Sequence, residues 1–123
     1  MTVEDSESTS RYDVAVVGGG PAGCSAAVFT SRYGLETVVF DRGRSSIQRC
    51  AYLENYLGFP AGIDIKTLYG LMHDHADEAG CEILADLVES VTHAEGDDGF
   101  VVETQEGQRV SARRVIAATR YDG

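Results

Sequence analysis

The sequence has no tryptophan, a single lysine and only two prolines among its 123 residues. It also lacks any apolar run near the ~20 residues that a transmembrane helix needs, so no membrane partner is expected. The first ten residues are polar and acidic, which excludes a secretory signal peptide and predicts a disordered tail over residues 1–10. The remainder, residues 11–123, is long enough for one domain with a buried core.

Cysteine is scarce and scattered. Cys24, Cys50 and Cys81 form no CxxC pair and no cluster with the histidines that would suggest a metal site. An odd number of dispersed cysteines is typical of a reducing compartment, which favours a cytoplasmic location.

Basic side chains are few, since 10 lysines and arginines stand against 20 aspartates and glutamates, for a net charge of −10. Nucleic-acid binding is not expected, because a phosphate backbone attracts surfaces of the opposite sign. The excess of acids has two interpretations. One is an ordinary solvated acidic surface, and the other is adaptation of a halophilic protein to high salt, where such charge maintains solubility.

Short apolar segments alternate with helical patterns, which predicts an α/β fold. The segment "YDVAVV" at 12–17 is apolar and β-branched, as expected for a buried parallel strand. A helix from Pro21 to Gly34 and a strand at 37–41 complete a βαβ unit. We therefore predict a Rossmann-like, three-layer domain whose parallel sheet carries a small antiparallel β-meander insertion. The later predicted elements are a long connection at 42–64, a helix at 66–79, a strand at 81–85, meander strands at 88–93, 100–104 and 109–111, and a strand at 114–118.

The helix predicted at 66–79 bears two histidines. His73 and His75 are two positions apart and point in different directions, so they are not expected to share a metal ion. The spacing of apolar and small residues predicts that His75 is half-buried and His73 exposed. The predicted inward stripe consists of Leu68, Leu71, Met72, His75, Ala76 and Ala79.

Three glycines separate the first strand from the first helix. Their spacing, Gly18-x-Gly20-x-x-Gly23, is that of the dinucleotide fingerprint. Gly18 would permit the tight turn, Gly20 the close approach of a diphosphate to the backbone, and Gly23 tight packing of the helix on the sheet. The helix N-terminus would supply N–H groups and partial positive charge. The structural alternative, in which the glycines only pack a helix on a sheet, leaves Gly18 and Gly19 unexplained.

Asp41 ends the second predicted strand, near the ~20-residue spacing expected of a ribose-binding acid. Its carboxylate would accept hydrogen bonds from the hydroxyls of an adenosine ribose and would repel a 2′-phosphate. Arg42 and Arg44 follow directly and could instead hold such a phosphate. The choice between NADH and NADPH therefore stays open.

Five segments occur in the order found in the FAD-binding domain of thioredoxin reductases and related flavoprotein disulfide reductases, which the chain resembles. They are "YDVAVVGGGPAGCSAA", "LENYLGFP", "GCEIL", "VVETQEG" and "ARRVIAAT". The resemblance covers Tyr12 to Thr119. The "ENYLGFP" segment makes it specific to the thioredoxin-reductase-like branch, since "GGGPAG" also fits other FAD proteins.

The resemblance implies FAD as the cofactor and NAD(P)H as the electron donor of a complete enzyme. It also implies roles for residues that spacing alone does not assign. Pro21 and Ala22 would join the three glycines at the diphosphate, and Val88 would lie near the adenine. The loop that contains Arg42, Gln48 and Asn55 would pass the ribityl chain and flavin, while Ala118 and Thr119 match the Ala-Thr at the end of a family strand.

Some family features differ here. Ser45-Ser46-Ile47-Gln48 replaces a Gly-Gly-Gln segment, and Arg120 replaces a glycine. The family's NADPH domain with its CxxC motif is not in the sequence, so the chain is interpreted as a fragment or a reduced version that is inactive alone. Cys50 is interpreted as an ordinary loop thiol, because Asn55 occupies the position where a redox partner would stand.

Three functions are consistent with these observations. The first is the FAD-binding portion of a flavin-dependent oxidoreductase that passes electrons from NAD(P)H through FAD to a disulfide or another acceptor. The alternatives are a non-catalytic nucleotide-binding module or remnant, and the NAD-binding domain of another dehydrogenase. No catalytic residue is predicted, and a homodimer is the one macromolecular partner considered.

Overall fold

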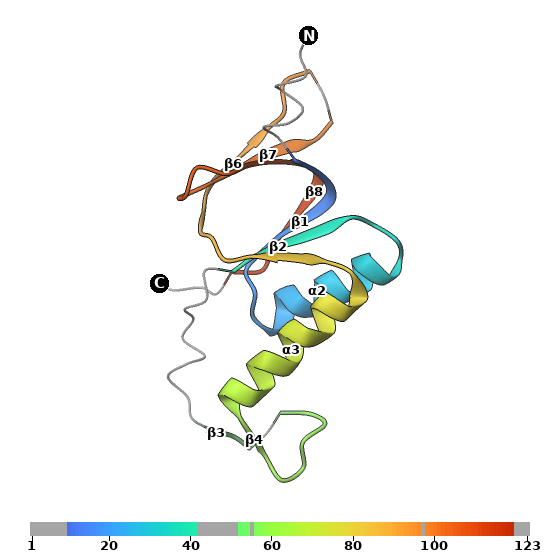
Figure 1. The fold of residues 1–123 in the computed structure, drawn as a ribbon, viewed down its shortest axis with the longest axis vertical. Coiled ribbons are helices and arrows are strands. Elements are labelled where there is room, and N and C mark those ends of the chain that lie inside the picture. The colour runs from blue at the N-terminus through green and yellow to red at the C-terminus, as the bar shows by residue number, and fades with distance from the viewer. Residues whose placement is uncertain (1–9, 42–51, 55, 97, 120–123) are drawn as a thin grey trace.

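The computed structural model describes residues 10–41, 52–54, 56–96 and 98–119. Among these, six strands form one sheet in the order β5-β2-β1-β8-β7-β6, and two helices lie together on one side of it (Figure 1). The prediction of a Rossmann-like α/β domain is confirmed. In chain order the elements are β1 (Ser10–Val17), α2 (Pro21–Arg32), β2 (Thr37–Phe40), β3 (Tyr52–Leu53), β4 (Ile63–Asp64), α3 (Ile65–Ala79), β5 (Glu82–Leu84), β6 (Val88–His93), β7 (Phe100–Thr104) and β8 (Arg109–Ala117).

The parallel part of the sheet consists of β5, β2, β1 and β8. Val16 of β1 pairs with Val39 of β2 on one side and with Ile116 of β8 on the other. These strands are apolar in successive positions because both faces of a parallel sheet are covered. The first strand begins at Ser10, two residues before the predicted start, so Ser10 belongs to the sheet rather than to the predicted tail.

β8 differs from the prediction of two separate strands at 109–111 and 114–118. It is one continuous strand that pairs antiparallel with β7 through Val110 and parallel with β1 as far as Ala117. The predicted gap fell on Ala112 and Arg113, between the two predicted ranges; in the structure Ala112 is buried and Arg113 is exposed. Ladder pairing with β1 continues past them, so the meander is an extension of the main sheet.

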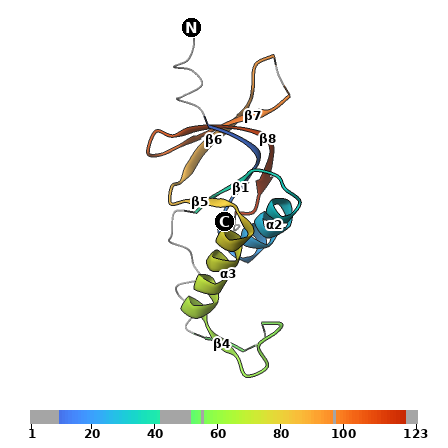
Figure 2. The same ribbon diagram turned by 45° about the vertical axis from the view of Figure 1, so that its right-hand side comes forward.

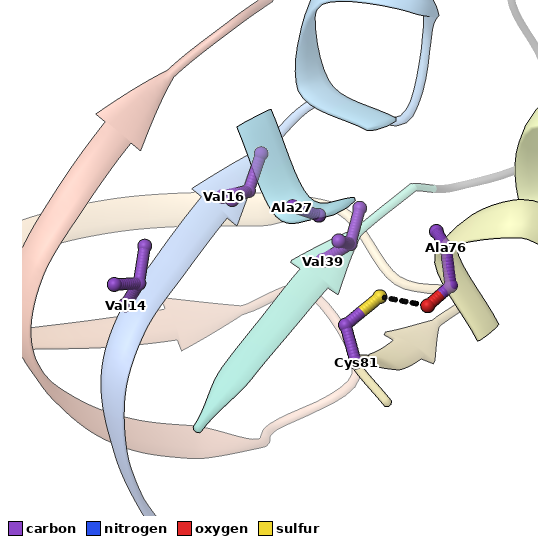
Figure 3. Packing of buried hydrophobic residues seen from close by; sticks show 6 residues of the cluster. All are labelled: Val14, Val16, Ala27, Val39, Ala76 and Cys81. Carbon is purple, nitrogen blue, oxygen red and sulfur yellow. Dashed lines mark hydrogen bonds between the residues drawn. The ribbon is translucent and has the colours of Figure 1, made fainter. Parts of the chain in front are cut away.

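The first core lies between the parallel strands and the two helices. Val14, Val16 and Val39 of the sheet face Ala27 of α2 and Ala76 of α3 (Figure 3). The buried positions of α2 are Gly23, Cys24 and Ala27, which are all small residues. Small side chains let this helix lie close to the strands. Neither helix in the described ranges has the length and apolar character of a membrane span.

The second core lies on the opposite face of the parallel strands. Ala15, Val38 and Phe40 meet Val102, Val110 and Ala112 from the meander side of the sheet. β1 and β8 bend strongly, which brings the meander over this face (Figures 1 and 2). Helices, parallel strands and meander thus form the predicted three layers, with the meander supplied by the same sheet.

The predicted connection at 42–64 contains a short antiparallel pair. Tyr52 of β3 pairs with Asp64 of β4, and Leu53 pairs with Ile63. The pair lies at the N-terminal end of α3, away from the main sheet (Figure 1). Ile63, Ile65 and Leu68 form a separate small core there, against which Leu53, Tyr56, Phe59 and Met72 pack.

The ends of α3 have ordinary capping chemistry. The carboxylate of Asp64 accepts hydrogen bonds from the N–H groups of Lys66 and Thr67, so it satisfies donors that have no partner inside the helix. Gly80 ends the helix with a φ of 109°. This left-handed conformation explains the glycine that stops the helix in the sequence.

Candidate functional site

The carboxyl ends of the parallel strands meet at one edge of the sheet. Three backbone hydrogen bonds join them: Gly18 N–H to the Phe40 carbonyl at 2.9 Å, Ala118 N–H to the Val17 carbonyl at 2.8 Å, and Asp41 N–H to the Leu84 carbonyl at 2.9 Å. The glycine turn, Asp41 and the end of β8 are therefore neighbours. In open α/β sheets, ligands bind in the crevice outside this edge.

Two glycines of the fingerprint are required by the packing of the turn itself. Gly18 has a φ of 116°, and a Cβ atom there would lie 2.6 Å from the carbonyl oxygen of Ala118. At Gly23 a Cβ atom would lie 1.8 Å from the carbonyl oxygen of Gly18. These distances confirm the predicted tight turn at Gly18 and tight helix packing at Gly23.

Gly19 also has a packing reason. A Cβ atom there would lie 2.4 Å from the Cβ atom of Asp41, whose side chain lies over the turn. The sequence argument that packing leaves Gly18 and Gly19 unexplained is therefore wrong. Support for a dinucleotide site therefore has to come from a different glycine of the fingerprint.

Gly20 is that glycine. Its φ of −82° is open to any residue, and a Cβ atom there would meet nothing within 4 Å. Gly20 is also the N-cap of α2, and no side chain caps the helix. Pro21 and Ala22 follow in the exposed first turn, where Pro21 lacks an N–H group and fits the first helical position. An uncapped helix N-terminus beside a backbone without a side chain suits an anionic diphosphate.

Asp41 directly follows β2 and lies beside this turn. Its side chain is 8% exposed, and the Tyr69 hydroxyl donates a hydrogen bond to its Oδ2 atom. The Nε2 atom of His73 lies 3.1 Å from the same oxygen and 3.2 Å from the carbonyl oxygen of Gly19. The Tyr69 and His73 rings pack together with centroids 4.4 Å apart. Burial and the hydrogen bond to Asp41 raise the pKa of Tyr69, so the hydroxyl keeps its proton and acts as the donor.

The sequence did not identify these two residues of α3. Tyr69 was not among the candidates, and the predicted exposure of the histidines is wrong because His73 is half-buried and His75 is exposed. The predicted stripe also included Leu71, which is 48% exposed. A signal did exist, since one set of positions has helical spacing and combines apolar residues with aromatic residues that have polar ends. That inward set is Ile65, Leu68, Tyr69, Met72, His73 and Ala76.

Only some of the other predicted site residues lie at the carboxyl edge of the parallel strands. Ala118 is half-buried and packs against the first core, and Thr119 beside it is exposed. Val88 begins β6, and its side chain packs against the second core. In the ranges that the structure describes, no group of three or more His, Cys, Asp or Glu side chains is placed to hold a metal ion. Arg42, Arg44, Gln48, Cys50, Asn55 and Arg120 lie outside the described residues.

Two cysteines of the described residues are buried, and one of them, Cys24, contacts the glycine turn. The Cys24 thiol donates to the carbonyl oxygen of Gly19 at 3.3 Å, and burial, then the charge of Asp41, raise its pKa to about 11. The Cys81 thiol donates to the carbonyl oxygen of Ala76 at 3.1 Å, and burial raises its pKa as well. Both environments favour the neutral thiol.

We expect the Cys24 and Cys81 thiols to be nearly inert in the folded chain. Only the thiolate is nucleophilic, and the shift at Cys24 from 9.0 to about 11 lowers its thiolate fraction at pH 8 by ~100-fold. Reactivity should rise about tenfold with each pH unit and level off only near pH 11. Alkylation by iodoacetamide, mapped by mass spectrometry with and without denaturant, measures this; equal rates at Cys24 in the two conditions would contradict it.

The profile of the pyridine nucleotide-disulphide oxidoreductase family matches residues 12–120. A bifunctional thioredoxin reductase/thioredoxin of Mycobacterium leprae is 37% identical over 121 residues, which are 96% of this chain and 26% of that protein. A thioredoxin reductase of Aquifex aeolicus is 30% identical over 110 residues, which are 88% of this chain and 33% of that protein.

A solved structure of a thioredoxin reductase has a similar fold over most of this chain. A thioredoxin reductase from Gloeobacter violaceus superimposes with a TM-score of 0.79 and 29% identity, covering 92% of this chain and 39% of that one. The chain thus spans between a quarter and a third of the length of the two curated relatives. By fold and sequence it belongs to the pyridine nucleotide-disulphide oxidoreductase family and is similar, over nearly its whole length, to one part of thioredoxin reductases.

Proposed function

We propose that this chain is the FAD-binding portion of a flavin-dependent oxidoreductase of the thioredoxin reductase type. The observation that carries the proposal is Gly20, the fingerprint glycine that neither its φ nor its packing requires. A position kept open at the uncapped N-terminus of a helix is suited to a diphosphate that approaches the backbone. The family assignment supports the interpretation that this diphosphate is part of a dinucleotide.

The proposed roles follow from position. Gly18 and Gly23 shape the turn, Gly20 admits the diphosphate, and the exposed first turn of α2 at Pro21 and Ala22 lies against it. Asp41 accepts hydrogen bonds from the adenosine ribose. Val88, Ala118, Thr119, Arg42, Gln48 and Asn55 remain proposed contacts on the family resemblance.

The complete protein would use the flavin chemistry that the resemblance to thioredoxin reductases implies. A bound FAD would supply the chemistry of hydride and electron transfer from a pyridine nucleotide to a disulfide or another acceptor. The described residues bind and orient the adenosine diphosphate half of that cofactor.

The second candidate is binding of NAD rather than FAD. The Asp41 carboxylate is the observation in its favour, since an acid at the end of β2 serves the adenosine ribose of either dinucleotide. The same negative charge disfavours NADP, whose 2′-phosphate would approach a carboxylate that is 8% exposed. Direct binding measurements separate the two candidates.

We expect the purified chain to bind FAD, with an affinity that falls about tenfold or more in Asp41→Ala, because a hydrogen bond to a charged group contributes about 1.5–3 kcal/mol. Titration of flavin fluorescence measures the affinity, and absorbance after gel filtration measures retained FAD. Asp74→Ala, at an exposed acid on α3, is the matched control and should bind as the wild type does. Binding of NAD without measurable binding of FAD would replace the proposal by its alternative.

A further inference from the structure

We propose that Tyr69 and His73 of α3 are positioning residues for Asp41. They hold its carboxylate over the glycine turn in the orientation that receives the ribose hydroxyls of the dinucleotide. The inference rests on the proposed function, because it assigns the direction of a carboxylate toward a ligand of that site. It adds α3 to the three elements of the dinucleotide fingerprint, which are β1, α2 and β2.

The two residues are one helical turn apart and act on the same atom. The Tyr69 hydroxyl donates to Oδ2 of Asp41, and His73 Nε2 lies 3.1 Å from that oxygen. Positions i and i+4 of a helix share one face, so both side chains leave α3 toward the end of β2. The contact between their rings, with centroids 4.4 Å apart, restricts the rotamers of both.

The surroundings of His73 also determine which ring nitrogen carries the hydrogen in the neutral imidazole. Its Nε2 atom faces the carboxylate of Asp41 at 3.1 Å and the carbonyl oxygen of Gly19 at 3.2 Å. A carbonyl oxygen and an ionised carboxylate only accept hydrogen bonds, so Nε2 must carry the hydrogen. Neutral His73 is therefore the Nε2–H tautomer, and one N–H group connects the ribose acid to the fingerprint turn.

The contacts of Tyr69 and His73 do more than compensate for the burial of the Asp41 carboxylate, because they also orient it. A carboxylate that is 8% exposed needs donors, and α3 supplies two to one oxygen. Asp41 also lies against the Cα atom of Gly19, where a Cβ would be 2.4 Å from its own. The carboxylate is thus fixed from α3 on one side and by the turn on the other.

The test compares ligands that differ at the ribose. FAD and its analogue with 2′-deoxyadenosine are titrated against the wild-type chain, Tyr69→Phe, His73→Phe and His73→Gln. The wild type should prefer FAD by about tenfold, as one hydrogen bond to a charged acceptor predicts. Tyr69→Phe and His73→Phe should each bind FAD several-fold more weakly and the analogue almost as before, so the preference falls toward one.

His73→Gln and one further variant, His75→Phe, distinguish positioning from general support. His73→Gln retains an N–H donor at the end of its side chain and should restore most of the preference for FAD. His75→Phe, on the exposed face of the same helix, should leave both affinities unchanged. Independently of any ligand, ¹⁵N NMR of the wild-type imidazole should show His73 protonated at Nε2 when neutral.

Each contrary result has a definite meaning. Equal loss of both ligands in the Phe variants, or wild-type affinities in them, would overturn the positioning role while leaving FAD binding intact. Tighter FAD binding by the Phe variants would mean that Tyr69 and His73 obstruct the ribose, and protonation at Nδ1 would contradict the donor arrangement. A wild-type chain that binds neither dinucleotide would overturn the proposed function and this inference together.

Discussion

A Gly20→Ala variant should fold with nearly wild-type stability and lose about a hundredfold or more in affinity for FAD. The added methyl group meets no protein atom within 4 Å, and the φ of −82° suits alanine. The cost to folding is limited to the weaker N-cap, at most about 1 kcal/mol. In the complex, however, the methyl group would stand between the backbone and the diphosphate and weaken several charge-assisted hydrogen bonds at once.

Two measurements on the same samples check this expectation. Urea unfolding gives the free energy of unfolding, and flavin fluorescence gives the affinity. Gly70→Ala is the matched control, because Gly70 is exposed on α3 and a Cβ atom there also meets nothing within 4 Å. Wild-type affinity for FAD in Gly20→Ala would mean that no diphosphate approaches this turn.

Gly23→Ala should have the opposite outcome and lose most of its stability, by about 3 kcal/mol or more. The new Cβ atom would lie 1.8 Å from the carbonyl oxygen of Gly18 and 3.3 Å from a methyl carbon of Val16. The nearest obstacle is backbone held in the tight turn, so no side-chain rotation relieves the overlap. Overpacking of this kind forces the helix away from the sheet and belongs to the most damaging substitutions.

The free energy of unfolding, or the absence of a cooperative transition, measures the effect. Gly70→Ala again serves as the control, since it makes the same chemical change inside a helix without an overlap. A loss below about 1 kcal/mol would show that α2 can move outward without loss of packing. Together with Gly20→Ala, the result separates the glycine needed for folding from the glycine needed for the ligand.

The sequence by itself determined the elements whose signal is local. The boundaries of β6 and β7 match their predicted ranges, and those of β2, α3 and β5 match within one residue at each end. Apolar periodicity, the fingerprint spacing and the terminal acid are all read within short windows, so they identified the β1–α2 turn and Asp41 without knowledge of their neighbours.

The tertiary structure decided what depends on contacts between distant segments. The pairing of β8 with β1 and β7 makes one strand from two predicted ones, and the β3–β4 pair lies in a predicted connection. The packing of α3 on α2 and the sheet determines which face of the helix turns inward. As a result Tyr69 and His73 are partly buried and His75 is exposed. Helical periodicity does not determine the rotation of a helix about its axis when aromatic residues with polar ends are mixed with apolar residues. In the structure, Tyr69 donates a hydrogen bond to Asp41, which is 28 positions away in the sequence, and this contact requires the Tyr69 side of α3 to turn inward.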